Sequence, residues 1–372
     1  MKYDAAIVGA GPAGSVLAYL LASQGVSVLL LEKERLPRYK PCAGGLTKRT
    51  LQCLPFHASE IIEDSTYKIE AFLNKEKVFE LSGEHPILWM VMRDKFDHFL
   101  VQKALDADVT LREGTHFISL EGGIGSLTLE TSAGRFASRF VIGADGVNSK
   151  VARALGFTVE RRLMCALEGE VYLSDLALLN TFAGCAHFDF GVVPKGYAWI
   201  FPKRDHLSVG VLTVSNEARS LRKSFAAYLE AKGLSESGKI KKLKAHLIPY
   251  KPNKNNTLGS QKGMLVGDAA GYTDPIMGEG IYFAIKEAWL AARVFVQALN
   301  EGFQVAGEYS QVLRDEFFDD ISNAGKLAYF LYHFPLLSHP ILKAYGKRLA
   351  AYHLAVTRDE KRYADFGRAL LS

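Results

Sequence analysis

The feature that most constrains this chain is an apolar stretch that runs directly into a glycine-rich turn. Residues 3–8 are Y-D-A-A-I-V, and residues 9–14 are G-A-G-P-A-G. After a short strand, the first glycine permits a tight turn, the second lets backbone N–H groups approach a pyrophosphate, and the third lets the next helix pack on the strand. The phosphates would face the N-terminus of that helix, where unpaired N–H groups and the helix dipole favour an anion. The turn therefore predicts a dinucleotide site contacted by Gly9, Ala10, Gly11, Pro12, Ala13 and Gly14.

The residues after the turn strengthen this prediction. A helix-compatible run at 13–24 is followed by a glycine, and an apolar run at 26–31 predicts a second strand that ends at Glu32. A carboxylate there, 18 residues after the last glycine of the turn, can accept hydrogen bonds from a ribose 2′-OH. This favours FAD or NAD over NADP, and the adjacent Lys33 belongs to the predicted site. Membrane insertion is the alternative, since no charged residue occurs between Asp4 and Glu32, but the early glycines and proline and the missing basic leader argue against it.

Composition limits the remaining possibilities. With 372 residues the chain is long enough for two domains or for one large α/β domain with an insertion. Its 48% hydrophobic and 23% charged residues are typical of a soluble globular protein, and a net charge of +5 gives no argument for nucleic acid. Four cysteines without C-x-x-C spacing favour a reducing, cytoplasmic setting, and we expect no metal site. The chain also lacks Walker A, H-E-x-x-H and G-x-S-x-G sequences, which excludes the commonest NTPase, metalloprotease and hydrolase sites.

The pattern of an apolar strand followed by glycine and aspartate recurs at 140–146 and 264–270, and the segment between them, 164–249, is rich in strand-forming residues. The sequence therefore predicts an α/β fold with a discontinuous Rossmann-type domain, an inserted antiparallel-sheet domain and a helical C-terminal region. Residues 67–79 alternate loosely and predict one strand. The predicted boundaries are 1–65, 90–160 and 258–300 for the nucleotide-binding domain, 66–89 and 161–257 for the sheet domain, and 301–372 for the helical region.

Three motifs, in this order, resemble those of a known group of flavoproteins. They are the glycine turn with Glu32, G-A-D-G at 143–146, and Gly267-Asp268 followed by Pro275 and G-E-G at 278–280. The group includes aromatic hydroxylases, flavin-dependent halogenases and geranylgeranyl reductases, and the resemblance weakens after about residue 305. It implies FAD in an extended form, with Asp268 hydrogen-bonded to the ribityl chain and the following helix N-terminus facing the flavin pyrimidine. That N-terminus would stabilise the negative charge of reduced flavin.

The same resemblance implies further contacts with the cofactor. Arg93, at the start of a helix, is expected to touch the cofactor, and Phe117 to pass its backbone near the adenine. The alternative for Arg93 is a solvated arginine, and the alternative for Asp145 is a turn-forming Asp-Gly pair. The cofactor contacts implied beyond the glycine turn are Glu32, Lys33, Ala43, Gly44, Arg93, Phe117, Asp145, Gly267, Asp268, Gly278, Gly280 and Ile281.

Two further stretches resemble geranylgeranyl reductases in particular. Residues 194–202, P-K-G-Y-A-W-I-F-P, match a P-x-x-Y-x-W-x-F-P motif, and residues 38–45, R-Y-K-P-C-A-G-G, resemble the basic, cysteine-bearing loop beside the flavin ring. Many relatives have C-G-G where this loop has C-A-G-G. Strand alternation places Tyr197, Trp199 and Phe201 on one face, where an aromatic wall suits an extended isoprenoid substrate. The alternative is that these rings only fill a core.

The resulting hypothesis is an FAD-dependent reductase of a geranylgeranyl or other prenyl chain. Hydride passes from N5 of reduced flavin to one carbon of a double bond, while an acid protonates the other carbon because an isolated alkene accepts hydride poorly. Cys42 is the first candidate for this acid and Tyr197 the second; the alternative is that Cys42 only packs against the flavin ring. The runner-up function is an FAD-dependent monooxygenase or halogenase acting on an aromatic or lipid substrate. A flavoprotein that only passes electrons is the non-catalytic alternative.

The expected partners are a hydrophobic isoprenoid or lipid substrate and an electron donor. Since no second nucleotide fingerprint occurs, both NAD(P)H and reduced ferredoxin stay open as donors. Arg35, Arg38 and Lys40 would suit an acidic partner protein or a substrate diphosphate, or would form a solvated surface loop. Residues 327–337 are apolar and aromatic with basic residues after them, so this segment either makes a peripheral membrane contact or covers the substrate cavity.

Overall fold

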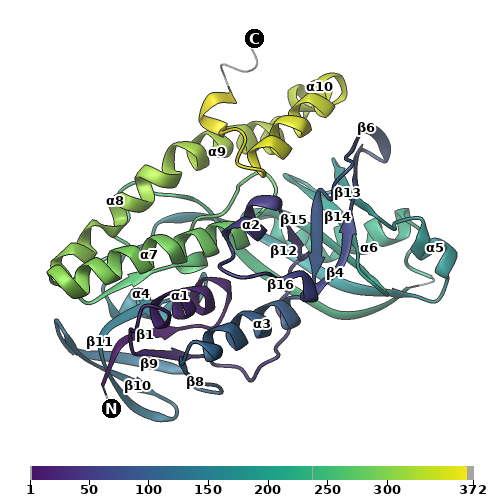
Figure 1. Ribbon diagram of the computed structural model, residues 1–372. Coiled ribbons are helices and arrows are strands. Elements are labelled where there is room, and N and C mark those ends of the chain that lie inside the picture. Colours follow the sequence, from purple (N-terminus) through teal and green to yellow (C-terminus); the bar gives the residue numbers. More distant parts are fainter. Residues whose placement is uncertain (1, 237, 367–372) are drawn as a thin grey trace.

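The computed structural model describes residues 2–236 and 238–366, which build two large sheets joined by helices (Figure 1). The first sheet has the order β8-β2-β1-β11-β10-β9, with β17 paired to β11. Strands β8, β2, β1, β11 and β17 pair in parallel, whereas β9, β10 and β11 form an antiparallel meander. The strands are β1 (Lys2–Val8), β2 (Val28–Leu31), β8 (Thr110–Arg112), β9 (Phe117–Gly123), β10 (Ser126–Thr131), β11 (Gly134–Gly143) and β17 (Gly263–Leu265).

Three helices cover the first sheet: α1 (Pro12–Ala22), α3 (Arg93–Asp106) and α7 (Ile281–Glu301). Helix α1 starts with proline at its first position, where the missing N–H costs nothing, and it packs against both α3 and α7. Strands β1 and β2 are apolar and buried on both faces, as parallel strands between layers are. These elements confirm the strand, turn and helix that the glycine motif predicts.

The second sheet has the order β16-β12-β15-β14-β13-β5-β6. The antiparallel prediction holds for every neighbouring pair except β5 and β13, which run parallel and come from segments of the chain more than 100 residues apart. Helix α6 (Leu221–Ala231) packs on β12 and β15. The strands are β5 (Lys68–Leu73), β6 (Glu76–Ser82), β12 (Arg161–Leu173), β13 (Cys185–Phe190), β14 (Gly196–Pro202), β15 (Leu207–Val214) and β16 (Gly238–Pro252).

The single strand predicted for residues 67–79 is wrong. The chain reverses at Asn74 and Lys75, which both have positive φ (50° and 74°), and it forms the hairpin of β5 and β6. Two consecutive residues with positive φ match the twist of a tight hairpin turn, and asparagine tolerates this conformation well.

The remaining elements connect the two sheets and cover the second one. A three-stranded sheet contains β3 (Gly45–Leu46), β4 (Ile62–Thr66) and β7 (Leu88–Val91). At the C-terminal end, α9 contacts β16 and α10 contacts β6, so both helices lie against one side of the second sheet (Figure 1). The other helices are α2 (Lys48–Cys53), α4 (Lys150–Ala154), α5 (Leu176–Asn180), α8 (Tyr309–Leu313), α9 (Asp319–His333) and α10 (Pro335–Val356).

The strands of the two large sheets come from different ranges of the chain. Every strand of the first sheet comes from residues 1–65, 90–160 or 258–300, and every strand of the second from 66–89 or 161–257. The domain boundaries themselves stay a prediction. Within the described ranges, no helix combines the length and the apolar character that crossing a bilayer requires.

Candidate active site

A large cavity of about 1380 Å³ connects the glycine turn with the second sheet and the C-terminal helices. Its walls come from β1, the loop after β2, the strands β12 to β14, the start of α7, and α9 and α10. Of the residues predicted for the site, only Ala10 and Gly14 do not line it. Those that line it are Gly9, Gly11, Pro12, Ala13, Glu32, Lys33, Cys42, Ala43, Gly44, Arg93, Phe117, Asp145, Tyr197, Trp199, Phe201, Gly267, Asp268, Gly278, Gly280 and Ile281. Their individual roles stay predictions.

The glycine turn combines two crowded positions with one open position. A Cβ on Gly9, where φ is +108°, would lie 2.3 Å from the carbonyl oxygen of Ala144, and a Cβ on Gly14 would lie 1.9 Å from that of Gly9. By contrast, no heavy atom beyond the adjoining residues lies within 4 Å of the Cβ position of Gly11 in the described chain. This space adjoins the N-terminus of α1, whose first turn holds no acidic side chain. The turn therefore fits a pyrophosphate.

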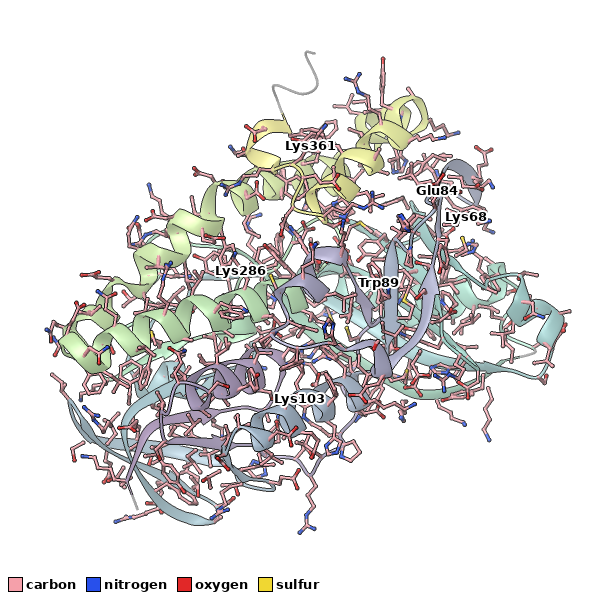
Figure 2. The ribbon with its side chains drawn as sticks, in the orientation of Figure 1. Lys68, Glu84, Trp89, Lys103, Lys286 and Lys361 are labelled. Carbon is pink, nitrogen blue, oxygen red and sulfur yellow. The ribbon has the colours of Figure 1, made fainter. Side chains whose placement is uncertain are left out.

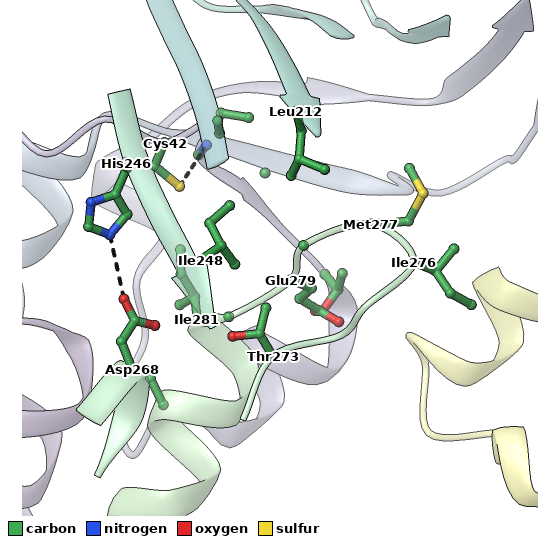
Figure 3. Close-up of a pocket in the computed structure, with 18 of the residues that line it drawn as sticks. Cys42, Leu212, His246, Ile248, Asp268, Thr273, Ile276, Met277, Glu279 and Ile281 are labelled. Carbon is green, nitrogen blue, oxygen red and sulfur yellow. Dashed lines mark hydrogen bonds and ion pairs between the residues drawn. The ribbon is translucent and has the colours of Figure 1, made fainter. Parts of the chain in front are cut away.

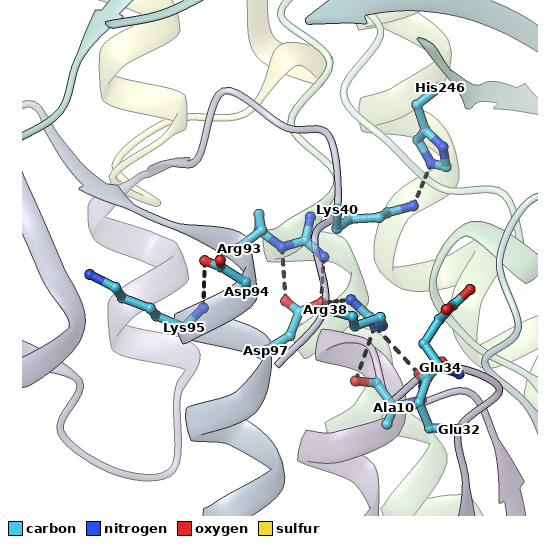
Figure 4. A network of polar contacts seen from close by, with 10 residues as sticks. All are labelled: Ala10, Glu32, Glu34, Arg38, Lys40, Arg93, Asp94, Lys95, Asp97 and His246. Atoms are coloured by element: carbon cyan, nitrogen blue, oxygen red, sulfur yellow. Dashed lines mark hydrogen bonds and ion pairs between the residues drawn. The ribbon is translucent and has the colours of Figure 1, made fainter. Parts of the chain in front are cut away.

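The carboxylate of Glu32 lies at the end of β2, next to this turn. Its Oε2 accepts a hydrogen bond from the N–H of Ala10 (3.0 Å), and its Oε1 accepts one from Glu34 (3.1 Å). The guanidinium of Arg38 contacts both Glu32 Oε2 (3.5 Å) and the carbonyl of Ala10 (3.4 Å), as Figure 4 shows. Glu32 is thus held in place, and its carboxylate is available to a hydroxyl in the cavity.

A buried ion-pair network continues from Arg38 to α3 (Figure 4). Arg93 donates through Nε to Asp97 Oδ1 (2.8 Å), and Arg38 donates to Asp97 Oδ2 (2.8 Å). Burial raises the pKa of Asp97, but the two guanidinium groups outweigh it and hold the pKa below its ordinary value. Only 9% of Arg93 is exposed, so the alternative of a solvated arginine is wrong. The same holds for Arg38, which does not lie on a solvated surface loop.

The carboxylate of Asp268, in the short turn Gly267–Ala269 after β17, faces His246 of β16 (Figure 3). Its Oδ2 lies 3.6 Å from Nε2 of His246, which is 2.6 Å from Nζ of Lys40. Burial raises the pKa of Asp268, but His246 and Lys40 outweigh this effect and hold the pKa below its ordinary value. The carboxylate is therefore ionised and can accept a hydrogen bond from a ligand hydroxyl. Lys40, like Arg38, is turned inward, which contradicts a solvated position for it.

The cysteine-bearing loop is anchored to β7 and β14. The N–H of Gly44 donates to Sγ of Cys42 (3.4 Å), and a Cβ on Gly44 would lie 2.1 Å from the carbonyl oxygen of Val91. Lys203 donates from Nζ to the carbonyls of Ala43 (2.7 Å) and Val91 (2.9 Å). Burial lowers the pKa of Lys203 to about 8, although Cys42 acts in the opposite direction. Cys42 therefore lies in a positively charged part of the cavity wall.

The aromatic residues of β14 form one wall of the cavity. Tyr197, Trp199 and Phe201 pack together on one face of the sheet, whereas Ala198 and Ile200 pack on the other face, against α6. The alternation predicted for this strand is confirmed. The wall continues across to Tyr332 of α9, whose ring stacks at 6.4 Å on that of Tyr197.

The hydroxyl of Tyr197 is engaged in the structure. It donates to the carbonyl of Met277 (2.6 Å), in the loop before α7. Burial raises the pKa of Tyr197, so the phenol stays protonated. This hydrogen bond fixes the wall relative to the G-E-G segment, and it occupies the proton that a donor role would need.

Asp145 binds the start of helix α4, a contact that neither the predicted cofactor role nor the alternative of an Asp-Gly turn specifies. Its Oδ2 accepts from the N–H groups of Lys150 (2.7 Å) and Val151 (3.1 Å) at the start of α4, and its Oδ1 accepts from the hydroxyl of Ser149. Asp145 also lines the cavity, as does the buried Phe117 at the start of β9.

Sequence reasoning missed a carboxyl group in the cavity wall. Glu168 of β12 is 3% exposed, accepts a hydrogen bond from the hydroxyl of Ser208 (3.0 Å) and makes a short hydrogen bond with the hydroxyl of Tyr39. Burial raises its pKa to about 7, although the Tyr39 and Ser208 hydrogen bonds lower it. The available signal was a pair of glutamates, Glu168 and Glu170, that follow the apolar run L-M-C-A-L within one predicted strand. Lys203 carries a similar signal, because it directly follows the apolar motif.

Comparison with known proteins agrees with this geometry. A family described as "FAD binding domain" matches residues 2–306. A digeranylgeranylglycerophospholipid reductase of Methanopyrus kandleri is 30% identical over 89% of this chain and 91% of its own length. A chloroplastic geranylgeranyl diphosphate reductase of rice is 30% identical over 82% of this chain and 68% of its own length. A geranylgeranyl bacteriochlorophyll reductase-like structure from Thermoplasma acidophilum has a TM-score of 0.82 at 24% identity, over 92% of this chain and 90% of that one.

Proposed function

The chain belongs to the geranylgeranyl reductase family of FAD-binding proteins, and from this premise we propose that it reduces the carbon–carbon double bonds of a prenyl chain. The observation that supports this proposal is the continuity of the cavity. One space joins the glycine turn and Asp268 to the aromatic wall of β14. A flavin held at the first end would face a chain that offers only apolar surface and double bonds at the second.

The residues at the first end suit FAD. The N–H groups of the glycine turn would hold the pyrophosphate, Glu32 the adenosine ribose, and Asp268 the ribityl chain. The N-terminus of α7, after Gly280, would face the flavin pyrimidine, where its dipole favours negative charge. Bound and reduced, the cofactor supplies a hydride equivalent.

The proton that complements the hydride would come from Cys42. This cysteine lines the cavity next to the buried cations Arg93 and Lys203. Both cations would stabilise the thiolate that is left after Cys42 has given its proton to the substrate. Tyr197, whose hydroxyl is bonded to Met277, would position the chain and the loop before α7. Cys42 is therefore the first candidate acid; Tyr197, the second, would have to release its hydrogen bond to the Met277 carbonyl before it could donate.

A Cys42→Ala variant tests the donor role. We expect turnover of a geranylgeranyl lipid to fall about 100-fold, as loss of a general acid does, while FAD content stays unchanged. Cys53→Ala, which changes a half-buried cysteine of α2 outside the cavity lining, is the matched control. Full turnover of Cys42→Ala with bound FAD would eliminate the donor role of this residue.

The reaction class is tested by anaerobic turnover with chemically reduced enzyme. Mass spectrometry of the lipid product should show the gain of one H₂ for each double bond lost, both with and without oxygen. Incorporation of an atom from labelled O₂ would instead indicate a monooxygenase. Flavin reoxidation with no change in any prenyl lipid would indicate an electron carrier.

We propose that either NAD(P)H or a reduced ferredoxin-like protein supplies the electrons. Of the basic loop residues, Arg38 and Lys40 are turned into the protein, so Arg35 and Lys33 are the exposed cations that an acidic partner would meet. Anaerobic mixing with NADH, NADPH or reduced ferredoxin, followed at the flavin absorbance, identifies the donor. An Arg35→Glu exchange should slow reduction by the protein donor and leave reduction by a nicotinamide unchanged.

We propose a peripheral membrane contact at the mouth of the cavity. Leu336 (91% exposed), Leu337 (60%) and Tyr345 (58%) are exposed apolar side chains of α10, and Tyr345 also lines the cavity. Lys347 on the same helix would favour anionic lipid, whereas the ammonium of Lys343 pairs with Glu76 (2.8 Å).

Flotation with anionic vesicles tests this contact. Leu336→Asp should abolish co-flotation, because it places a charge where an apolar side chain would enter the lipid. Leu176→Asp, at a 68% exposed leucine of α5, is the matched control and should not. Equal flotation of both variants, or none by the unmodified protein, would contradict the membrane contact.

A further inference from the structure

A second group of reactive side chains lies on the second sheet, on the face that does not line the cavity. Cys185 and His187 alternate along β13, and Glu70 of the parallel strand β5 is the direct partner of His187. A ligand atom from each of the three lies within 4.8 Å of the other two. We propose that Glu70, Cys185 and His187 bind a zinc ion or a divalent cation of similar chemistry.

The alternation of β13 separates this group from the flavin cavity. Phe188 and Phe190 point into the cavity, so Cys185 and His187, at alternate positions, point to the opposite side. On that side His187 is enclosed by aromatic rings, stacked on Phe72 at 5.6 Å and edge-on to Phe182 at 5.1 Å. The cluster is thus a separate, largely dry site.

His187 itself indicates a missing ligand. It is 8% exposed, and neither of its ring nitrogens has a hydrogen-bond partner among the described residues. A buried imidazole without a partner is unfavourable, because at least one N–H or lone pair has lost water without replacement. Coordination of a metal by one nitrogen would satisfy that atom.

The distance to Glu70 fits a metal between the two groups. Nδ1 of His187 lies 3.8 Å from Oε2 of Glu70, which is too long for a hydrogen bond. Two ligands of a tetrahedral zinc, each at about 2.0–2.1 Å, are separated by about 3.4 Å, so small side-chain movements would complete the site.

The second carboxylate oxygen is already bound by lysines. Oε1 of Glu70 pairs with Nζ of Lys68 (2.9 Å) and of Lys77 (3.3 Å), which leaves Oε2 directed at His187. Both lysines are more than one-third exposed, and Lys68 is labelled in Figure 2. The two lysines would therefore orient the carboxylate of Glu70 without touching the metal, as residues behind the ligands of metal sites do. Because both lysines are exposed, solvent screens the repulsion between their charge and the cation.

The ligand types select the metal. Thiolate, imidazole and carboxylate together suit Zn²⁺, and three protein ligands leave a fourth position for water. Binding would release the thiol proton of Cys185. The absence of C-x-x-C spacing does not argue against such a site, since its ligands come from two strands far apart in sequence. The ion would fix β13 to β5 behind the aromatic residues that face the cavity.

Metal analysis of the holoenzyme tests the proposal. Untagged protein from zinc-supplemented cells, dialysed without chelator, should contain about one zinc per chain by mass spectrometry of the metal. Zinc content should fall at least about tenfold in Cys185→Ser and in Glu70→Gln. Cobalt substitution should add absorption bands at wavelengths beyond those of oxidised flavin, with a thiolate charge-transfer band that Cys185→Ser removes.

Cys165→Ser is the matched control, because Cys165 is a buried cysteine of β12 in the same sheet but outside the cluster. It should keep both zinc and the cobalt bands. Glu70→Gln, at a residue 12% exposed in its side chain, is the variant that best preserves packing if Cys185→Ser does not fold. No zinc in the unmodified protein, or equal zinc in Glu70→Gln and in the unmodified protein, would overturn the site.

Discussion

At the scale of single residues, two glycines of the turn have different roles: Gly11 leaves space for the cofactor, whereas Gly14 is needed for folding. Gly11 has φ −80° and ψ −177°, which any residue adopts, and its Cβ position faces open cavity. Gly11→Ala should therefore fold normally yet bind FAD at least about tenfold more weakly, because its methyl group occupies the space for the pyrophosphate. Gly14→Ala should instead unfold at lower denaturant, since its Cβ would lie 1.9 Å from the carbonyl oxygen of Gly9.

Flavin absorbance after gel filtration and urea unfolding measure these two effects separately. Stoichiometric, tight FAD in Gly11→Ala would mean that the turn does not carry the pyrophosphate. A loss of stability in Gly11→Ala equal to that of Gly14→Ala would equally contradict the distinction.

Glu168 predicts a pH dependence of stability. Burial raises its pKa from 4.5 to about 7, so between these values the folded protein holds a proton that the unfolded chain has released. The stability that this proton contributes is fully present below pH 4.5 and is lost as the pH rises to about 7, on the order of 3 kcal/mol at most. Glu168→Gln, which imitates the neutral carboxyl group, should lose less stability between pH 5 and 7.5 than the unmodified protein does.

Urea unfolding at several pH values checks this difference. Glu121→Gln, at an exposed carboxylate near the β9–β10 turn, should leave the pH dependence as it is. Identical pH dependence of Glu168→Gln and of the unmodified protein would show that Glu168 is ionised in the fold.

At the scale of elements, the aromatic wall depends on a glycine in the neighbouring strand. Gly210 of β15 is the direct partner of Trp199 of β14, and a Cβ there would lie 2.0 Å from the indole ring. Gly210→Ala should displace the indole into the cavity, destabilise the fold by about 1–3 kcal/mol and raise the KM for a prenyl substrate. FAD content should stay unchanged. Gly123→Ala, whose Cβ would have no contact within 4 Å, is the control, and equal KM values in the two variants would contradict this role for Gly210.

At this scale, the sequence predicts those structural features whose pattern lies within a few neighbouring residues. The glycine turn and the alternation of β14 are local patterns, and both are correct in the structure. The hairpin at Asn74 and Lys75 was missed because the residues on either side share one alternating pattern. The partner of Lys203 in the cysteine loop, and that of Glu168, lie more than 100 residues away, so only the fold brings them together.

At the scale of the whole molecule, one buried arginine connects three parts of the chain. Arg49 of α2 is 4% exposed, pairs with Glu279 of the G-E-G segment, donates to the carbonyl of Val356 at the end of α10 (3.3 Å), and lies over the ring of Tyr282 (4.1 Å). The cavity end that would face the flavin is thus coupled to the helices that close its opposite end. A change at Arg49 should act on both.

Arg49→Met should destabilise the protein by about 3–5 kcal/mol, because the largely buried carboxylate of Glu279 loses its cationic partner and keeps only the hydroxyls of Thr47 and Thr50. Hydrogen exchange should increase first in α10, because the Val356 carbonyl loses the hydrogen bond that it accepts from Arg49. FAD should dissociate faster, because the G-E-G segment loses its ion pair with Arg49.

Lys286→Met is the matched control. Its ion pair with Glu316 (3.3 Å) is on the surface of α7 (Figure 2), where loss of the pair costs under about 1 kcal/mol. If both variants lost the same stability, the buried pair would not couple the cavity to the C-terminal helices. The double variant Arg49→Met/Glu279→Leu should recover part of the loss, since it removes the uncompensated charge, whereas exchange in α10 should stay fast because the bond to Val356 is still missing.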